Sequence, residues 1–391
     1  MRVLIYTEYF LPIPGGVQTI VLELAMGLAA WTPYQPGAER IEVTVVTRTR
    51  ERTAGDDALP FRLVRRPTLP ELVGLLRGAD IVHLAGPVML PLGLSLALRK
   101  HVVVEHHGYH SICPNGLLVY GPESALCPGH FMAGRYGMCV RCNSEELGRW
   151  KSFCSLMLTF PRRWLCRHVA ANIAVSRHVA KRIALPHTKT IYHGISDSGS
   201  VAPNGSRAAN HPLQIGYVGR LVSEKGLPLL LEAAKRLDNG GFLFHLTFVG
   251  DGPDRSELED LTRRLGLQAR TTFLGELSGT GLEGAVRPLQ VVVMPSRWEE
   301  TAGLAVIEQM MRGGIVIAAD IGGLSEVVAD TGLKFSPGDS GALYSCLRQV
   351  LQEPSLAALL GPAARARAIK VFNRDSMIQG HVSLYQEALH P

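Results

Sequence analysis

The sequence has few charged residues, few aromatic residues and no apolar run long enough to cross a membrane. Of its 391 residues, 19% are charged and 6% are aromatic. The longest nearly apolar stretch, residues 84–98, is too short to span a bilayer and is interrupted by prolines. The opening residues, "MRVLIYTEYF", differ from a secretory signal peptide because an acid and aromatic rings break up the apolar run. These absences argue against a membrane-spanning protein, and we expect a cytoplasmic one.

Acidic residues are absent between Leu147 and Ser196, although the net charge of the whole chain is only +6. Nine basic residues occupy this acid-free stretch: Arg149, Lys151, Arg162, Arg163, Arg167, Arg177, Lys181, Arg182 and Lys189. They either cover ordinary solvated helix faces or form a surface that attracts an anionic partner, such as a phosphate-bearing acceptor or the inner leaflet of a membrane. Because aromatics are sparse and no nucleic-acid-binding motif accompanies these residues, nucleic acid is the less favoured partner.

What the chain does contain is the pattern of an α/β protein with two domains. A length of 391 residues exceeds what one hydrophobic core usually supports. Short β-branched runs alternate with helical patterns, which predicts parallel sheets built from strand–helix–strand units. Strands are predicted at residues 3–7, 43–47, 81–84, 102–105 and 172–175 in the first half, and at 214–218, 245–249, 271–274, 291–295 and 315–319 in the second. We therefore expect two doubly wound α/β domains.

A segment with the composition of a linker separates the two halves. Residues 196–212 are rich in Ser, Gly, Asn and Pro and show no apolar periodicity. We expect a first domain at 1–195, a second at 213–370, and a C-terminal helix at 371–391 that packs back on the first domain. Because ligands of doubly wound sheets bind at the carboxyl ends of the strands, the expected site is the cleft between the two halves.

An irregular, cysteine-rich insertion interrupts the first domain at residues 109–144, and a loop of this length needs a reason to be ordered. Its four cysteines, two of them in the CxxC sequence "CVRC", are Cys113, Cys127, Cys139 and Cys142. Four neighbouring thiolates can hold a structural zinc ion or, less favoured, an iron–sulfur cluster, whereas disulfides are not expected in a reducing compartment. The alternative is that they are small buried hydrophobic residues, as we expect for Cys154, Cys166 and Cys346.

Two strand-to-helix turns carry residue types that suit phosphate. Gly15 and Gly16 follow the first strand, where amides at a helix start favour an anion, although a plain tight turn has the same pattern. In "YVGRLVSEKG", Arg220 and Lys225 flank the turn after a strand. Cations are slightly disfavoured at a helix start, so a diphosphate site explains this pair better. The later "VGDGPDR" lacks the third glycine of a dinucleotide-binding fingerprint, so we do not interpret it as an NAD site.

Two glutamates stand with seven residues between them in "PSRWEETAGLAVIEQMMRGG". The spacing alone fits ordinary helix charges. If a helix starts near Gly303, however, the backbone amides of Ala302, Gly303 and Leu304 can meet phosphate oxygens. Glu300 can then reach a polyol, and Glu308 can accept hydrogen bonds from the vicinal hydroxyls of a ribose. Both acids would serve one ligand, a nucleotide diphosphate-sugar.

Taken together, these segments resemble the retaining glycosyltransferases of family 4, which have the GT-B fold of two Rossmann-like domains facing each other across a cleft. The resemblance extends over essentially the whole chain and is carried by "PGGV", "EHHG", "GRLVSEKG", "VGDGPDR", "FLGEL", "PSRWEETAGLAVIEQMMRGG" and "GGLSEVV". One departure is Ala302, because the family usually has an aromatic residue before this glycine. We expect donor binding to survive there, with a roomier pocket wall.

The resemblance implies which residues bind the nucleotide part of the donor. Arg220 and Lys225 would bind the diphosphate, and Glu308 would bind the ribose. Backbone amides at Gly16 and at residues 302–304 would complete the donor site. No metal is needed for the diphosphate in this family, because the two cations and the helix amides neutralise the leaving group.

The resemblance also implies roles at the transferred sugar. Glu300 would hold its hydroxyls, and His107 of "EHHG" would contact it. Retention of configuration favours attack on the face that the leaving group departs from, with the leaving phosphate accepting the proton of the acceptor. A covalent intermediate on Glu300 is the less favoured route.

We therefore predict a retaining hexosyltransferase that uses a UDP- or GDP-sugar. The expected acceptor is a sugar, a lipid-linked precursor or a polysaccharide, and peripheral contact with the inner face of the membrane fits the basic stretch. One alternative is a nucleotide-sugar epimerase of the same fold, which would lack the pair of glutamates. Another is a metal-knuckle protein that binds nucleic acid or membrane, which would leave the donor motifs unexplained.

Overall fold

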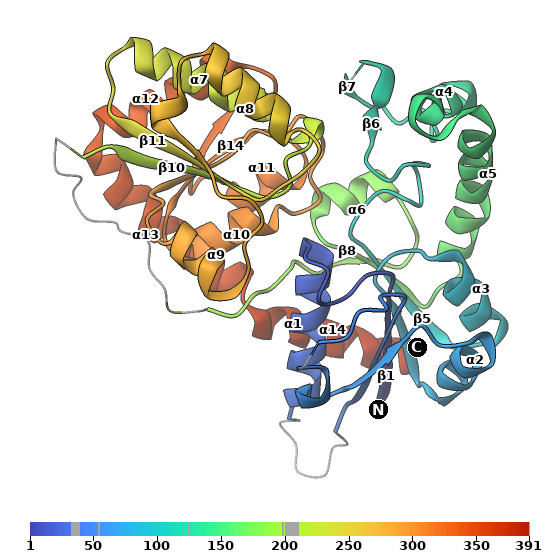
Figure 1. Cartoon of the computed structure of the whole chain (residues 1–391). Helices are drawn as coiled ribbons and strands as arrows, with labels where there is room; N and C mark the ends of the chain where they lie inside the picture. The colour runs from blue at the N-terminus through green and yellow to red at the C-terminus, as the bar shows by residue number, and fades with distance from the viewer. Residues whose placement is uncertain (33–39, 54, 124, 198, 200–210, 391) are drawn as a thin grey trace. The chain divides into compact units, whose positions relative to one another are not determined.

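The computed structural model describes residues 1–391 apart from 33–39, 54, 124, 198, 200–210 and 391. Most of the expected linker therefore lies outside the described residues. The chain forms two compact units, the first made of residues 1–122, 127–196 and 372–391, and the second of 123–126 and 197–371. Each unit is built around one parallel sheet (Figure 1), which confirms the predicted fold class of two Rossmann-like α/β domains.

The first sheet is fully parallel and doubly wound. Its strands are β1 (Arg2–Thr7), β2 (Glu42–Thr47), β3 (Arg62–Arg65), β4 (Ile81–Leu84), β5 (His101–His106), β8 (Ala171–Ala174) and β9 (Thr188–Thr190). They pair in the order β3-β2-β1-β4-β5-β8-β9. Strands β1, β4, β5 and β8 are buried almost throughout, which accounts for their continuous apolar runs. Between β1 and β4 the winding changes direction, and ligands of such sheets bind at this switch point.

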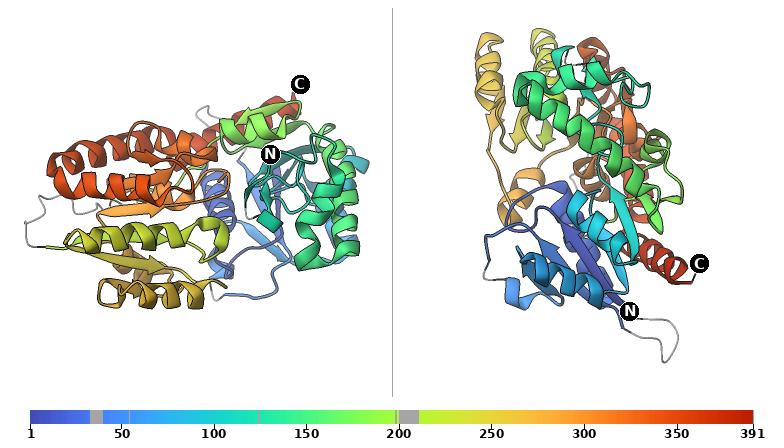
Figure 2. Two further views of the ribbon diagram at one scale, coloured as in Figure 1. Left: turned by 90° about the horizontal axis from the view of Figure 1, so that it is seen from above. Right: turned by 90° about the vertical axis from the view of Figure 1, so that its right-hand side faces the viewer.

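Helices cover both faces of the first sheet. They are α1 (Gly16–Ala30), α2 (Leu69–Gly78), α3 (Met89–Ala97), α4 (Tyr136–Leu147), α5 (Arg149–Cys166), α6 (Arg177–Ile183) and α14 (Arg374–Leu389). Helices α1 and α14 pack together on one side of the strands, and α2 and α3 lie on the other (Figures 1 and 2). Helices α4 and α5 pack on each other beyond this layer, and the short strands β6 (Val119–Tyr120) and β7 (Ala125–Leu126) lie in the preceding insertion.

The C-terminal helix is built into the first unit by backbone contacts. The Ile195 N–H donates to the Phe372 carbonyl at 3.0 Å, and the Arg374 N–H donates to the Ile195 carbonyl at 3.1 Å. In α1, a Cβ at Gly27 would lie 2.5 Å from the side chain of Ile378. The absence of a side chain at Gly27 therefore lets α14 approach α1 closely.

The second sheet repeats the same architecture with the strand order β12-β11-β10-β13-β14-β15. Its strands are β10 (Leu213–Val218), β11 (Phe244–Val249), β12 (Thr271–Phe273), β13 (Val291–Met294), β14 (Ile315–Ala319) and β15 (Leu333–Phe335). Its helices are α7 (Leu227–Asn239), α8 (Arg255–Arg264), α9 (Gly279–Val286), α10 (Leu304–Met311), α11 (Gly322–Val328), α12 (Ser340–Gln352) and α13 (Pro354–Val371). Helix α7 packs against α8 and α12 on one face, and α10 packs against α13 on the other (Figure 1). The switch point lies between β10 and β13.

All ten predicted strands are present, and five short strands of the described residues were not predicted: β6 and β7 of the insertion, and three in the two large sheets. Strands β3, β9 and β15 lie at or near the sheet edges and contain polar or charged residues. An edge strand is paired on one side only and need not be apolar, so its sequence lacks the run that reveals a central strand. Across the described part of the chain, none of the helices has both the length and the apolar character needed to cross a membrane.

Candidate active site

In the second unit, the loop after β10 is held by close backbone contacts with the loop after β11. The Leu221 N–H donates to the Asp251 carbonyl at 2.9 Å. A Cβ at Gly252 would lie 2.2 Å from the Leu221 oxygen, and one at Gly250 would lie 2.0 Å from the Gly219 oxygen. The glycines of "VGDGPDR" therefore permit close packing around "GRLVSEKG", consistent with the exclusion of an NAD fingerprint.

The two cations of "GRLVSEKG" have different surroundings. The carbonyl of Arg220 accepts a hydrogen bond from the Tyr217 hydroxyl at 2.7 Å, while its side chain is exposed. The Lys225 ammonium forms an ion pair with Glu300 and lies 5.3 Å from the centroid of the Trp298 ring. Arg220 is thus open to solvent, whereas Lys225 is already balanced by a carboxylate of the protein.

Glu300 is a buried carboxylate with two side-chain partners. Its exposed fraction is 5%. Lys225 pairs with its Oε1 atom, and the Ser296 hydroxyl donates to the same oxygen at 2.7 Å. Because β10 and β13 are neighbours, the loops that carry Lys225 and Glu300 meet at the switch point of the second sheet. The cation and the hydroxyl offset the cost of removing this carboxylate from water.

Two glycines of "GGLSEVV" hold the backbone around Glu300. The Gly323 N–H donates to the Glu300 carbonyl at 2.6 Å. A Cβ at Gly323 would lie 2.1 Å from the Thr301 oxygen. Gly322 has φ of +57°, and a Cβ there would lie 2.7 Å from the Glu300 oxygen. The start of α11 therefore packs backbone to backbone against "EET", which links this motif to the position of Glu300.

Helix α10 begins directly after this loop. Gly303 is its N-cap residue, with φ of +76°, and a Cβ there would lie 2.4 Å from the Leu324 side chain. Ala302 is buried and Leu304 is the first residue of the helix. The amides at this end carry the positive end of the helix dipole, where an anion is favoured.

Glu308 lies on the second turn of α10 and has an unusual proton affinity. Its side chain keeps some contact with solvent, yet burial raises the pKa of its carboxyl to about 7, against the opposing charge of Arg312. Near neutral pH the carboxyl is therefore divided between its neutral and ionised forms. A ligand that donates hydrogen bonds, such as a vicinal diol, favours the ionised form.

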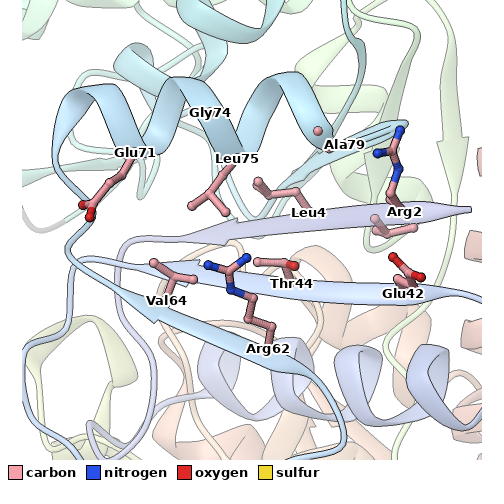
Figure 3. Close-up of a pocket in the computed structure, with 12 residues that line it drawn as sticks. Arg2, Leu4, Glu42, Thr44, Arg62, Val64, Glu71, Gly74, Leu75 and Ala79 are labelled. Atoms are coloured by element: carbon pink, nitrogen blue, oxygen red, sulfur yellow. The ribbon is translucent and has the colours of Figure 1, made fainter.

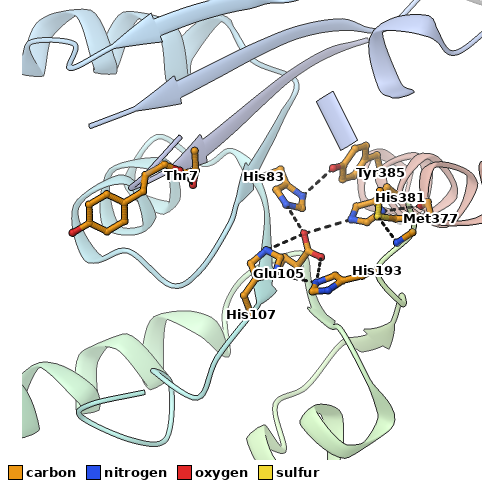
Figure 4. A network of polar contacts seen from close by, with 10 residues as sticks. Thr7, His83, Glu105, His107, His193, Met377, His381 and Tyr385 are labelled. Atoms are coloured by element: carbon orange, nitrogen blue, oxygen red, sulfur yellow. Dashed lines mark hydrogen bonds and ion pairs between the residues drawn. The ribbon is translucent and has the colours of Figure 1, made fainter. Parts of the chain in front are cut away.

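In the first unit, Glu105 is the centre of a buried cluster of imidazoles (Figure 4). Its Oε2 atom lies 3.1 Å from His83 Nε2 and 3.5 Å from His107 Nε2. The same oxygen lies 3.7 Å from His381 Nε2, and Oε1 lies 4.0 Å from His193 Nε2. His107 Nδ1 is also 3.2 Å from His193 Nε2. His107, the predicted sugar contact, is thus held on one side by a carboxylate and on the other by an imidazole.

The C-terminal helix contributes two side chains to this cluster. The Tyr385 hydroxyl lies 2.9 Å from His83 Nδ1. His381 Nδ1 lies 2.8 Å from the Met377 carbonyl. Since a carbonyl can only accept, the proton of a neutral His381 is on Nδ1. Residues from β4, β5 and α14 therefore meet around one carboxylate (Figure 4).

Burial governs the protonation of the cluster. It lowers the pKa of His193 to about 3, and it also lowers the pKa values of His83 and His107. Burial alone would raise the pKa of Glu105, but the surrounding imidazoles, His107 and His381 among them, outweigh it and hold the pKa well below its usual range. Two sets that share Glu105 have ligand atoms within 4.8 Å of one another, a spacing that would also admit a metal ion. The contacts above account for the arrangement without one.

The four cysteines of the insertion lie in one region, but among the described residues no three of their sulfurs are within 4.8 Å of one another. Burial raises the pKa of Cys139 to about 12, and the neighbouring thiols of Cys113, Cys127 and Cys142 raise it further in the same direction. Asn115 contacts two of the sulfurs: Cys113 Sγ lies 2.9 Å from its Oδ1 atom, and its Nδ2 atom lies 3.6 Å from Cys142 Sγ. Four thiols gathered in this way have the composition of a tetrahedral metal site.

Part of the insertion differs from the irregular loop that we expected. Its last nine residues, 136–144, form the start of α4, so Cys139 and Cys142 lie one turn apart on a helix. Of the three expected core thiols, Cys166 is buried, whereas Cys154 and Cys346 are partly exposed. A largely polar helix that packs mainly on α5 and on the rest of the insertion has weak apolar periodicity, which explains why its sequence did not reveal it.

The basic stretch is also less open than its sequence indicated. The Arg163 guanidinium donates to the Ile183 carbonyl at 2.8 Å, and Arg162 donates to the His110 carbonyl at 3.3 Å. Arg182 donates to the Cys127 carbonyl at 3.1 Å. These three side chains support the local backbone.

A hollow of about 500 Å³ lies elsewhere in the first unit, between α2 and strands β1, β2 and β3 (Figure 3). Arg2, Glu42 and Arg62, from the beginnings of these strands, are among its lining residues. Arg2 is held by Asp80 at 2.8 Å. The described lining includes none of the predicted site residues, because it is at the amino-terminal end of the sheet.

The described contacts join Lys225 to Glu300 in the second unit, while His107 and Gly16, the first residue of α1, belong to the first. Sequence reasoning missed Glu105 and His83, which belong to the buried cluster that contains His107. A signal for both exists, since each is the charged or titratable residue in an otherwise apolar strand segment, "VVVE" and "IVHL".

Comparison with known proteins identifies the family. The model described as Glycosyltransferase Family 4 matches residues 14–198, and the model described as Glycosyl transferases group 1 matches residues 202–367. The glycogen synthase of Mycobacterium tuberculosis is 31% identical over 316 residues, which cover 78% of this chain and 73% of that protein. The chain belongs to this glycosyltransferase family.

Other similar proteins share less sequence. A 2-deoxystreptamine glucosyltransferase of Streptomyces kanamyceticus is 29% identical over 218 residues, so the match spans 51% of this chain and 56% of that protein. The Anabaena protein HepE, solved in complex with UDP-glucose, has a TM-score of 0.71 at 19% identity, covering 99% of this chain and 100% of that one. At such an identity the likeness shows the GT-B fold alone.

Proposed function

We propose that the protein transfers a sugar from a nucleoside diphosphate donor to a hydroxyl acceptor with retention of anomeric configuration. The observation that carries this proposal is the contact of Lys225 with Glu300, completed by Ser296, at the switch point of the second sheet. A cation suited to a phosphate oxygen lies there beside a carboxylate suited to sugar hydroxyls. In a nucleotide sugar these two groups are joined through the anomeric carbon, so one ligand can meet both.

The nucleotide part of the donor is assigned to residues around this pair. Arg220 and Lys225 bind the diphosphate. The side chain of Arg220 is exposed to solvent, and the ammonium of Lys225 can contact a phosphate oxygen while it stays paired with Glu300. Backbone N–H groups at 302–304 and at Gly16 donate hydrogen bonds to phosphate oxygens at helix starts. Glu308 binds the ribose diol in its ionised form. In this scheme the diphosphate requires no metal.

In the proposed reaction, the bond between the anomeric carbon and the phosphate oxygen breaks, and the acceptor hydroxyl forms the new bond on the same face. The acceptor proton passes to the departing phosphate. Lys225 and Arg220 stabilise the charge that develops on that phosphate. Glu300 accepts hydrogen bonds from the sugar hydroxyls, and His107 contacts the sugar in an orientation maintained by Glu105.

The donor and acceptor are proposed from the relatives and the surface. The UDP-glucose bound by the Anabaena protein and the glucosyl transfer named for the Streptomyces enzyme support a UDP-sugar over a GDP-sugar. The acceptor is a sugar, either lipid-linked or part of a polysaccharide. A lipid-linked acceptor fits a peripheral position at an anionic membrane, and the basic stretch supports that position.

We also propose that the four cysteines of the insertion hold one structural zinc ion rather than an iron–sulfur cluster. The thiols of Cys113, Cys127 and Cys142 lie close enough to Cys139 to raise its pKa, and binding an ion would require the four sulfurs to draw together to metal-ligand spacing. The Gly121 N–H donates to Cys142 Sγ at 3.3 Å, an interaction that stabilises a thiolate ligand. The ion would order the insertion and take no part in transfer.

The proposal is tested by nucleotide-dependent thermal stabilisation and by product formation. UDP should raise the melting temperature more than GDP or ADP, because a ligand that binds only the native state stabilises it. Lys225→Ala should weaken binding of UDP more than that of UMP, with Lys235→Ala, at a half-buried lysine of α7 that also forms an ion pair, as the matched control. Equal losses for UDP and UMP would contradict the diphosphate role. A screen of donors by mass spectrometry that shows no sugar transfer would contradict the activity.

A further inference from the structure

Helix α5 turns its large apolar side chains toward solvent. Five of them recur at alternating spacings of three and four residues and form one stripe along the helix, the α5 stripe: Trp150, Phe153, Met157, Phe160 and Trp164. The exposed fractions at its two ends are 74% for Trp150 and 59% for Trp164. In the right-hand view of Figure 2, α5 is on the side turned toward the viewer. A helix that only faced water would carry polar residues at these positions.

The inward side of α5 carries small polar residues instead. The Ser152 hydroxyl donates to the Gly148 carbonyl at 2.8 Å, and the Thr159 hydroxyl donates to the Ser155 carbonyl at 3.0 Å. The Ser155 hydroxyl donates to the Pro114 carbonyl at 3.1 Å. These groups are satisfied locally, and the same side of the helix also buries Leu156, which packs with Phe131 and Cys139, and Cys166. Within the stripe, Phe160 packs on the rings of Phe131 and Tyr136, whereas Trp150 and Trp164 at its two ends are largely exposed.

Charges of one sign flank the stripe. Arg149 and Lys151 are exposed at the start of α5, and Arg167 is exposed just after its end. The acids that come nearest in sequence, Glu145 and Glu146, are at the end of α4, before the stripe begins. The stripe and its flanks thus combine exposed aromatic rings with cations, a combination that anionic lipid surfaces attract.

The charge pattern decides between two occupants of this surface. Pairing with a second copy of α5 would bring cations against cations, because the stretch from Leu147 to Ser196 contains no acid to pair with them. A bilayer with anionic headgroups offers both a negative surface and an apolar layer. Tryptophan rings favour that boundary, where one edge stays hydrated while the ring leaves water.

We propose that α5 is a membrane-docking surface. The α5 stripe enters the interfacial layer of an anionic membrane, and Arg149, Lys151 and Arg167 contact lipid phosphates. The helix lies in the plane of the membrane and does not cross it. This inference deepens the proposed function, on which its biological meaning rests, because it puts the enzyme where a lipid-linked acceptor is embedded.

The test is binding of the full chain to vesicles, with no donor present. Vesicles of phosphatidylcholine with about 30% phosphatidylglycerol should sediment the protein, and vesicles of phosphatidylcholine alone should not. Raising the salt to about 0.5 M should weaken binding, because exposed charges are then screened. Tryptophan fluorescence should be quenched by brominated lipid tails, since Trp150 and Trp164 enter the acyl boundary.

The variant Trp150→Ser/Phe153→Ser/Trp164→Ser should reduce the vesicle partition coefficient by ~10-fold or more, since keeping even one aromatic ring out of the interface is worth about that factor. Leu359→Ser is the matched control, because Leu359 is an exposed apolar residue of α13 in the other unit. It should partition like the wild type. Binding of UDP and the circular dichroism spectrum should be the same in all three proteins.

Three results would overturn the proposal. In the first, the wild-type protein does not bind anionic vesicles. In the second, the triple serine variant binds them as the wild type does. In the third, the wild type is a dimer without lipid and the triple variant is a monomer. Failure of sugar transfer with intact vesicle binding would instead count against the proposed function alone.

Discussion

The ammonium of Lys225 and the carboxylate of Glu300 are 75 residues apart in the sequence and form one ion pair in the second unit, with the Ser296 hydroxyl 2.7 Å from the same carboxylate oxygen. Each group is therefore the electrostatic partner of the other before any ligand arrives. A donor that brings negative phosphate to Lys225 and hydroxyls to Glu300 replaces part of this pairing without leaving either charge unbalanced.

Glu300→Gln should lower turnover by ~10²-fold while nucleotide binding stays within a few-fold of wild type. The amide keeps the shape of the carboxylate, but it removes the charge that pairs with Lys225 and one acceptor for sugar hydroxyls. The measurement is the initial rate of nucleoside diphosphate release. Glu299→Gln, at the preceding position, is the control and should keep most activity. Wild-type turnover in purified, folded Glu300→Gln would contradict the role.

The affinity for the nucleotide should rise with pH through the titration of Glu308. Its pKa in the folded protein is about 7, raised from an ordinary value of 4.5. The folded protein then binds this proton more tightly than the unfolded chain, so the free protein loses stability as pH rises from about 4.5 to about 7. The ionised carboxylate is the form that accepts ribose hydroxyls. From about pH 6 to about pH 8, affinity should increase ~10-fold, because only the ionised fraction binds.

Glu308→Gln should remove most of this pH dependence and make the free protein more stable above neutral pH. Isothermal titration with UDP and thermal unfolding across the same pH range measure the two effects. A pH dependence in Glu308→Gln as steep as in the wild type would assign the titration to another group.

Gly323→Ala should lower both stability and turnover although residue 323 contacts no ligand in the proposed scheme. A Cβ there would lie 2.1 Å from the Thr301 oxygen, so the backbone that carries Glu300 must move. We expect a loss of ~1–3 kcal/mol in the free energy of unfolding. Gly284→Ala in α9 is the matched control, because nothing lies within 4 Å of its Cβ position. Alanine there should be neutral or stabilising in chemical denaturation.

Glu105→Gln should affect the sugar more than the nucleotide. The amide has no negative charge to attract the imidazoles of His83, His107 and His381, and its N–H₂ group adds a buried donor that can be left without a partner at a cost of ~1–3 kcal/mol. Turnover should fall while UDP affinity is kept, because His107 loses its orientation. Tyr385→Phe, which removes only the contact with His83, should have a smaller effect on turnover. Equal UDP losses and turnover losses in Glu105→Gln would indicate general unfolding instead.

Cysteine-to-serine changes in the insertion should release a metal. Protein prepared under reducing conditions should carry about one zinc per chain by elemental analysis. Cys139→Ser/Cys142→Ser should release it, make residues 109–144 sensitive to protease and lower activity, with UDP binding largely kept. Cys346→Ser, a partly exposed cysteine of the second unit, is the control. If the wild-type protein contains no metal, the four cysteines are packing residues and the zinc proposal is wrong.

The sheets could be predicted because their strands are buried on both faces. Such strands need apolar, β-branched runs, and β1, β5 and β14 have them. The individual residues Lys225, Glu300 and Glu308 could also be named, because their motifs are local. Their environments could not, since the ion pair joins two loops that only the strand order brings together.

The imidazole cluster was beyond sequence reasoning for a related reason. His83, Glu105 and His381 come from three separate segments, and the last lies 276 residues after the second (381 minus 105). Their contact depends on α14 packing on the first sheet. The same holds for Arg163, which looks like a surface cation in the sequence and instead donates to the Ile183 carbonyl.

The discontinuity of the first unit has a consequence for how the protein is made. Residues 372–391 complete that unit, yet the ribosome synthesises them after residues 197–371 of the second. The surface of α1 at Gly27 and the carboxylate of Glu105 therefore stay uncovered by α14 until residues 372–391 have been synthesised. The second unit is nearly continuous in the sequence, so it is synthesised in full before the first unit can be completed.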